Sequence, residues 1–127
     1  MNEKLVFVYN ADSGLLNFIL DAAHKIFSPS TYPCNLCALT YTLTGLPRWK
    51  RFVKNLPWPA EFLHKDELAA QYSVADAPLP AAFWWDGHTL QPWISAEEME
   101  EFETLDEMMT AVSGRTQQLL LEKQQVG

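Results

Sequence analysis

The chain has few of the residues that would make it basic or carry it across a membrane. It has nine Lys and Arg against sixteen Asp and Glu, for a formal net charge of −7. Nucleic-acid-binding domains need cationic surfaces that neutralise phosphates, so this balance excludes nucleic acid as an expected partner. No apolar run approaches the roughly 18 residues of a membrane-spanning helix, and no signal peptide is recognisable. We therefore expect a cytoplasmic protein with no membrane partner.

Glycine and cysteine are also scarce, with five and two residues among 127. Two cysteines cannot cross-link a domain of this size, which fits a reducing compartment. The chain has no Gly-x-x-x-x-Gly-Lys-Ser/Thr loop, so it is not a P-loop NTPase. In contrast, 48% of the residues are hydrophobic and 13% aromatic, too apolar a balance for a disordered chain. The length fits one domain, which we expect over residues 1–114, followed by a polar extension over residues 115–127.

The first half of the chain predicts a strand, a helix and an irregular segment. Residues 5–9 (LVFVY) form a continuous apolar run, typical of a central strand that is covered on both faces. Residues 10–14 (NADSG) supply turn and capping side chains, and apolar residues then recur at helical spacing over residues 16–27. Residues 28–59 are rich in proline, and within them residues 36–43 fit a strand and a helix equally well. Residues 47–54 predict a short helix with Pro47 at its first position and its charged side chains in water.

The second half predicts a strand, a hairpin and closing helices. Residues 60–64 read as a strand, followed by a brief helix capped by Asp66. Residues 81–85 and 90–94 flank an Asp-Gly turn and predict a hairpin, whose second strand should be a sheet edge because Pro92 cannot donate to a ladder.

Two capping boxes follow the hairpin. They are formed by Ser95 with Glu98 and by Thr104 with Glu107, and they predict two consecutive helices. The second helix should present apolar side chains to the sheet and end, or be interrupted, at Gly114, with a frayed helical extension over residues 115–127 as the expected continuation. These side chains are Leu105, Met108, Met109 and Val112.

This order of elements resembles the thioredoxin-like fold. The fold class that follows is α/β, with a mixed sheet of about four strands flanked by helices and an irregular cysteine-containing insertion after the first helix. In that family a cis-proline introduces the hairpin strand, and Pro80 stands at that place. The resemblance implies that Pro80 lies beside the substrate groove if the cysteines fold back toward it. Thioredoxins carry their Cys-x-x-Cys between the first strand and first helix, whereas here it follows the helix.

Two motifs resemble a family of small bacterial proteins of unassigned biochemical role. They are residues 8–14 (VYNADSG) and residues 32–41 (YPCNLCALTY). Some of those relatives carry a GTPase label, which we reject for this chain because it lacks the phosphate-binding loop.

The best chemical lead is the pair Cys34 and Cys37, which is spaced to form a disulfide or to hold one metal ion. By analogy with thioredoxins, Cys34 would attack a disulfide and Cys37 would resolve the mixed disulfide. A helix beginning at Cys34, or the basic residues of the segment 48–54, would favour the thiolate. No resident cofactor is expected; the alternatives are zinc or copper(I) held by Cys34 and Cys37, or buried structural thiols.

Two functions therefore compete. The first is a thiol–disulfide oxidoreductase or electron-transfer protein whose redox substrate is a protein partner. The second is a non-catalytic binding or adaptor module on the same fold, which uses an aromatic hairpin or an acidic face while the cysteines are structural or hold metal. The hairpin aromatics are Trp84, Trp85 and Trp93. The acidic face comprises Glu97, Glu98, Glu100, Glu101, Glu103, Asp106 and Glu107, for which a solvated surface is the simpler interpretation.

Other polar features carry weaker signals. The segment 10–14 could bind an anion at a helix N-terminus, although helix capping explains its residues without a ligand. His24, His64 and His88 have no standard metal-ligand spacing, so we expect each to be structural or exposed.

Overall fold

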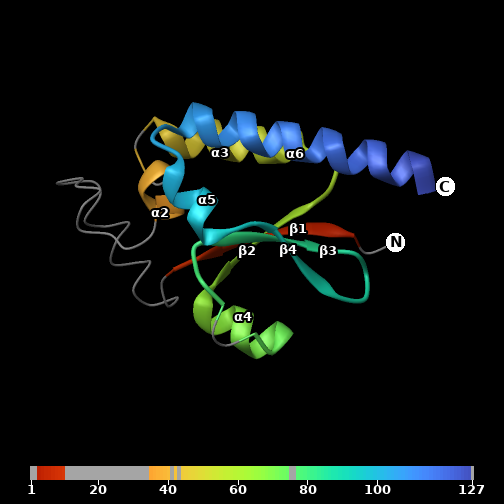
Figure 1. Ribbon diagram of the computed structural model, residues 1–127. Helices are drawn as coiled ribbons and strands as arrows, with labels where there is room; N and C mark the ends of the chain where they lie inside the picture. The colour runs from red at the N-terminus through yellow and green to blue at the C-terminus, as the bar shows by residue number, and fades with distance from the viewer. Residues whose placement is uncertain (1–2, 11–34, 41, 43, 75–76, 127) are drawn as a thin grey trace.

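The computed structural model describes residues 3–10, 35–40, 42, 44–74 and 77–126 (Figure 1). The helix expected over residues 16–27 and the turn expected over residues 11–14 lie outside these residues, as do Cys34 and His24.

A four-stranded mixed sheet forms the centre of the domain. Its strands are β1 (Lys4–Tyr9), β2 (Ala60–His64), β3 (Ala81–Trp85) and β4 (Leu90–Ile94), in the order β2-β1-β3-β4. β1 runs parallel to β2 and antiparallel to β3, and β3 pairs antiparallel with β4. The α/β class with a mixed sheet is therefore confirmed. So are the central place of β1 and the edge place of the strand that contains Pro92.

Side chains of β1 alternate between two apolar cores, because successive residues of a strand point to opposite faces. Leu5, Phe7 and Tyr9 belong to the core on one face, and Val6 and Val8 belong to the core on the other. All five are buried. The continuous apolar run in the sequence reflects this coverage of both faces.

Helices cover both faces of the sheet (Figure 1). α3 (Gly45–Lys54) and α6 (Leu105–Val126) lie side by side over the face that carries Phe7, with α2 (Asn35–Thr40) and α5 (Ala96–Glu101) at one end of that layer. α4 (Lys65–Tyr72) covers the opposite face.

The basic, amphipathic helix expected over residues 47–54 is present as α3. It begins at Gly45, so Pro47 lies within its first turn rather than at its first position. Trp49 is buried, with its ring edge-on to Phe7 at 5.3 Å between ring centroids. Phe52 and Val53 pack against the same core, while the four basic side chains of α3 are exposed, as expected.

Residues 35–40, where sequence pattern left strand and helix open, are helical. Leu36 and Thr40 are both fully buried on α2, one helical turn apart. The Thr40 hydroxyl donates to the carbonyl oxygen of Leu36 at 2.6 Å, so its polar group is satisfied within the helix.

The expectation that Asp66 caps α4 is wrong, because His64 is the N-cap residue. The Glu67 carboxylate accepts the backbone N–H of His64 at 2.8 Å and also contacts the His64 ring. This backbone hydrogen bond, foremost, holds the pKa of Glu67 below its ordinary value. Asp66 instead lies in the first turn of the helix, where its charge meets the positive end of the dipole.

The expectation that Gly114 ends or interrupts the helix is also wrong, since α6 continues through it to Val126; the helical extension expected beyond Gly114 is present as part of the same helix. Val112 and Thr116 are buried on either side of Gly114, and Arg115 binds both the carbonyl oxygen of Trp93 and the Glu98 carboxylate. These contacts outweigh the cost of about 1 kcal/mol of a glycine inside a helix. The helix therefore crosses the boundary between residues 114 and 115.

The hairpin and the caps after it follow the sequence signals. Gly87 has a φ of 100°, and the Asp86 carboxylate accepts the backbone N–H groups of His88 and Thr89 in the connection between β3 and β4. Ser95 caps α5 with Glu98 at its third position. The peptide bond between Leu79 and Pro80, directly before β3, is cis.

Candidate functional site

The cysteine segment lies only partly within the described residues. Cys34 lies outside them, and Cys37 is placed by its backbone as the third residue of α2. The spacing of the two thiols and their exposure therefore stay predictions. The structure does describe the helix that carries Cys37 and what holds it in place.

α2 is anchored by both apolar and polar contacts. Leu36 and Ala38 are buried, and Leu36 belongs to the core that contains Tyr9 and Met99. Asn35, which stands between the two cysteines in the sequence, donates from its side-chain nitrogen to the carbonyl oxygen of Met99 at 2.6 Å. It also donates to the carbonyl oxygen of Phe102 at 2.9 Å. The cysteine-bearing turn is thus tied to α5 and its C-terminal end.

α2 and Pro80 lie at the same end of the sheet. β1 ends there, β3 begins there, and α2 and α5 stand over that end of the helical layer (Figure 1). Pro80 is buried directly before Ala81, which pairs with Val8 of β1. The fold therefore brings the segment of Cys37 and Pro80 to one end of the molecule, although they are more than 40 residues apart in the sequence.

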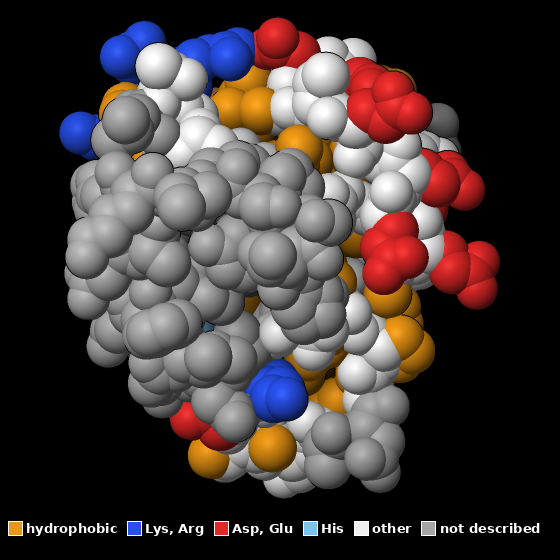
Figure 2. Space-filling model, turned by 90° about the vertical axis from the view of Figure 1, so that its left-hand side faces the viewer, with side chains coloured by type: hydrophobic (Ala, Val, Ile, Leu, Met, Phe, Trp, Pro, Cys, Tyr) orange, Lys and Arg blue, Asp and Glu red, His pale blue; other side chains and the backbone are white. Residues whose placement is uncertain are grey.

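Charges of opposite sign are separated on this end of the molecule. Figure 2 shows that most acidic side chains visible from this side lie along one flank, whereas several basic side chains lie at the opposite upper edge. Arg48 of α3 forms an ion pair with Asp106 of α6. Within the described residues, the side chains of Lys50, Arg51 and Lys54 have no hydrogen-bonding or ionic partner. Three cations of α3 are thus left without a counter-charge from the described part of the chain.

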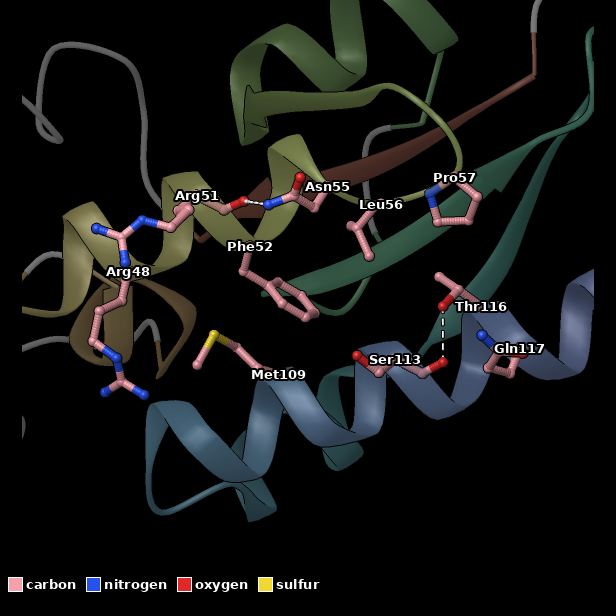
Figure 3. Close-up of a pocket in the computed structure, with 10 residues that line it drawn as sticks. All are labelled: Arg48, Arg51, Phe52, Asn55, Leu56, Pro57, Met109, Ser113, Thr116 and Gln117. Atoms are coloured by element: carbon pink, nitrogen blue, oxygen red, sulfur yellow. Dashed lines mark hydrogen bonds between the residues drawn. The ribbon is translucent and has the colours of Figure 1, made fainter.

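A groove of about 490 Å³ runs between α3 and α6 (Figure 3). Phe52 and Met109 reach into it from the two helices, and Arg48 and Arg51 lie at one end. On its α6 side, the Thr116 hydroxyl donates to the carbonyl oxygen of Ser113 at 2.8 Å. The groove is open and shallow, and it suits a surface contact better than an enclosed small molecule.

A polar network on the opposite face of the sheet links three elements. Lys4 lies 3.2 Å from the Glu61 carboxylate, which also accepts the Tyr72 hydroxyl at 2.8 Å. Burial acts to lower the pKa of Lys4, but hydrogen bonds with Tyr72 and Glu61 outweigh it and leave that pKa raised. Burial, foremost, raises the pKa of Tyr72. No local motif reveals this network, because Lys4 and Glu61 are 57 positions apart.

The hairpin tryptophans contact the protein's own side chains and backbone. Trp84 is buried with its ring edge-on to Trp58 at 4.8 Å, and Trp85 packs edge-on to Tyr72 at 5.3 Å. The Trp93 side chain is partly buried against the core that contains Trp84, and its carbonyl oxygen accepts from Arg115. Packing within the domain therefore accounts for these aromatics without a partner.

Glu98, Asp106 and Glu107 of the acidic face, and His64, have structural roles. Glu98 and Glu107 take part in helix-capping contacts, and Glu98 and Asp106 pair with arginines. His64 caps α4, and His88 is exposed in the hairpin connection. Among the residues that the structure describes, no group of three or more His, Cys, Asp or Glu side chains is arranged to hold a metal ion. In the same part of the chain, no helix is both long and apolar enough to span a membrane.

In comparisons with known proteins, no family model matched the chain, and neither did any curated protein or solved structure.

Proposed function

We propose that this chain is a cytoplasmic thioredoxin-like protein in which Cys34 and Cys37 alternate between dithiol and disulfide, with a protein as redox partner. The order of elements supports the fold, since a strand, helices, a second strand, a helix, a hairpin and two closing helices follow one another. Pro80 directly before β3 has the place that the resemblance assigns to the family's proline. The observation that carries the proposal is the anchoring of α2, which holds Cys37 at the same end of the sheet as Pro80.

The proposed reaction is an exchange of thiols and a disulfide. The Cys34 thiolate attacks one sulfur of a partner disulfide, forms a mixed disulfide, and releases the partner's other sulfur as a thiolate that takes up a proton. Cys37 then loses its proton and attacks the sulfur of Cys34. This second step frees the partner as a dithiol and leaves the Cys34–Cys37 disulfide. Two electrons pass from the chain to the partner.

Anchoring matters for such a reaction because the resolving thiol must reach the mixed disulfide. A rigid helix keeps one of the two cysteines in a constant position relative to the docking partner. Asn35 supplies that rigidity directly, since it lies between the cysteines and binds two carbonyl oxygens of the α5 region.

The test combines thiol counting by mass spectrometry with trapping of the mixed disulfide. The purified chain is oxidised with glutathione disulfide, alkylated with and without reductant, and weighed. We expect a reversible intramolecular disulfide in the natural sequence. Cys37→Ser should accumulate a glutathione adduct on Cys34, whereas Cys34→Ser should accumulate far less adduct. Equal adducts on both variants would contradict the assigned roles, and thiols that stay reduced in the natural sequence would contradict the proposal.

The same sample distinguishes the alternatives in which the cysteines hold zinc or copper(I) or are structural. Stoichiometric zinc or copper that is lost in the Cys34→Ser/Cys37→Ser double variant would favour a metal site. Reduced, metal-free thiols that resist alkylation until the chain unfolds would favour the non-catalytic binding module. A melting temperature measured for each serine variant separates loss of chemistry from loss of fold.

A further inference from the structure

We propose that the outer edge of β2, together with the hollow beside α3, binds an extended acidic segment of a partner protein as an added strand. This docking site is independent of the thiol chemistry, because it uses none of the residues of the cysteine segment.

The outer side of β2 carries backbone N–H and C=O groups that no other described strand pairs with. Within the described residues the strand has β1 as its only neighbour in the sheet. The backbone N–H of Leu5 donates to the carbonyl oxygen of Pro59 at 2.9 Å, and Leu5 is opposite Ala60 in the register. This parallel register directs the N–H and C=O of Glu61 toward β1 and those of Ala60 and Phe62 away from it. A row of such groups is a template for another strand.

Glu67 reduces the number of backbone groups that β2 can offer to an added strand at its C-terminal end. The backbone N–H of His64, the next outward-facing residue, is already donated to the Glu67 carboxylate at 2.8 Å. The groups left for a partner are therefore those of Ala60 and Phe62, together with the carbonyl oxygen of His64. This is enough for a short strand of about four to six residues.

A hollow of about 410 Å³ lies beside this edge, between β2 and the C-terminal half of α3. Its apolar wall includes Val53, Leu56, Trp58 and Phe62, which are only partly buried. Because alternate residues of an added strand would point to the same face as Phe62, every second side chain of the partner would face this hollow. The edge supplies backbone pairing and the hollow supplies side-chain contacts.

The positive charges beside the hollow indicate that the partner segment is acidic. Lys50 and Lys54 line the hollow and are exposed, and within the described part of the chain neither has an ionic partner. Arg48 of the same helix, by contrast, is paired with Asp106. A strand that places carboxylates toward α3 would supply counter-charges for Lys50 and Lys54, which the described residues do not provide.

The same charges argue against a second copy of this chain as the occupant. Antiparallel pairing of two β2 edges about a two-fold axis at Phe62 would place both α3 helices on the same side of the joined sheet. Lys50 and Lys54 of both copies would then gather about that axis. These like charges would oppose the dimer locally, whereas they favour an acidic strand.

The test uses the full chain with its thiols kept reduced. The probe is an eight-residue peptide in which glutamate alternates with valine, labelled with fluorescein at its N-terminus and titrated by fluorescence anisotropy. Its glutamates share one face, which would lie over the hollow: their methylene groups would contact the apolar wall and their carboxylates would reach Lys50 and Lys54, while the valines point to the opposite face. We expect saturable binding that weakens at least tenfold in Lys50→Glu/Lys54→Glu. The matched single variants are Lys54→Glu and Lys65→Glu, which change charge equally. Only Lys54→Glu should weaken binding, because Lys65 lies on α4 and does not line the hollow.

Backbone pairing is tested with two N-methylated peptides, one methylated on its valines and the other on its glutamates. N–H groups of alternate residues point to opposite sides of a strand, so only one of the two peptides should lose binding. Equal binding of the two methylated peptides would rule out pairing as an added strand. Equal affinity of the Lys54→Glu and Lys65→Glu variants for the unmethylated peptide would rule out the role of charge. Failure of the unmethylated peptide to bind at millimolar protein would overturn the site. A chain that sediments as a dimer, and becomes a monomer in Phe62→Lys, would instead assign the edge to a second copy.

Discussion

The side-chain amide of Asn35 donates a hydrogen bond to the carbonyl oxygen of Met99, 64 positions further along the chain, at 2.6 Å. The same nitrogen donates to the carbonyl oxygen of Phe102 at 2.9 Å. One side chain thereby donates to a carbonyl group in the last turn of α5 and to that of its C-cap residue, at a helix end where carbonyl groups lack intrahelical donors. It also holds the cysteine-bearing α2 against the domain.

Replacement of Asn35 by alanine should lower the free energy of unfolding by about 1–3 kcal/mol, because two partly buried carbonyl groups lose their donor. Asn35→Asp should cost more, since a carboxylate would face two carbonyl oxygens. Urea unfolding measures both. The control is Asn55→Ala, which removes an exposed hydrogen bond of the same side-chain type to the carbonyl oxygen of Arg51. A cost for Asn55→Ala equal to that for Asn35→Ala would contradict the anchoring role.

Two helical glycines should respond in opposite directions to replacement by alanine. Gly114→Ala should stabilise the chain by about 0.5–1 kcal/mol, because a Cβ there meets no atom within 4 Å and alanine favours a helix. Gly45→Ala should destabilise it, because the new Cβ would clash with the Thr42 hydroxyl and lie 3.0 Å from the carbonyl oxygen of Leu39. Thermal unfolding of the two variants tests the packing of α2 against α3. Stabilisation by both substitutions would show that Gly45 is not tightly enclosed.

Trp49 combines a large buried surface with a buried N–H that has no hydrogen-bond partner within the described residues. Trp49→Ala should cost about 3–5 kcal/mol, because it opens a cavity beside Phe7 and Phe62. Trp49→Phe should cost much less, since it keeps most of the ring and removes the unpartnered donor. Chemical denaturation followed by far-ultraviolet circular dichroism compares them. Similar losses for both variants would mean that the indole N–H does have a partner.

The Glu67 carboxylate makes stability depend on pH in the acid range. Its pKa is lowered below the ordinary value of 4.5, chiefly by the backbone N–H of His64. The folded state therefore binds this proton less readily than the unfolded state does. Its contribution is fully present above pH 4.5 and is lost as the pH falls through the lowered pKa. Glu67→Gln should remove this part of the acid sensitivity.

Melting temperatures measured from pH 7 to pH 3 test this expectation. The difference between the natural chain and Glu67→Gln should shrink as the pH falls. The control is Glu100→Gln, which changes an exposed carboxylate of α5. A Glu67→Gln difference that is constant with pH would contradict the link to the His64 amide.

Local signals in the sequence were sufficient to predict most of the helices and strands that the structure describes. The strand predicted over residues 60–64 has those bounds in the structure, and the hairpin strands also match. Alternation, proline placement and capping boxes act within a few residues, so they can be read without knowledge of the fold. The segment over residues 36–43 was ambiguous because its leucines fit the period of a strand as well as that of a helix. In the structure residues 35–40 are helical, and Leu36 and Thr40 are buried.

The two errors have the same origin. Asp66 is a good capping residue by type, but β2 extends to His64, so α4 begins directly after it. Gly114 is a good helix end by type, but Val112 and Thr116 are buried on either side of it. In both cases a local preference of about 1 kcal/mol was overridden by contacts with distant elements.

The sequence by itself determined the two-sided core strand, the proline-bearing edge strand, the basic face of α3 and the presence of a closely spaced cysteine pair. Only the tertiary structure decided which of these lie together: Asn35 against Met99, Lys4 with Glu61 and Tyr72, and the lysines of α3 beside the free edge of β2. Periodicity and capping depend on neighbours within a turn or a strand, whereas these contacts join residues brought close only when the elements pack.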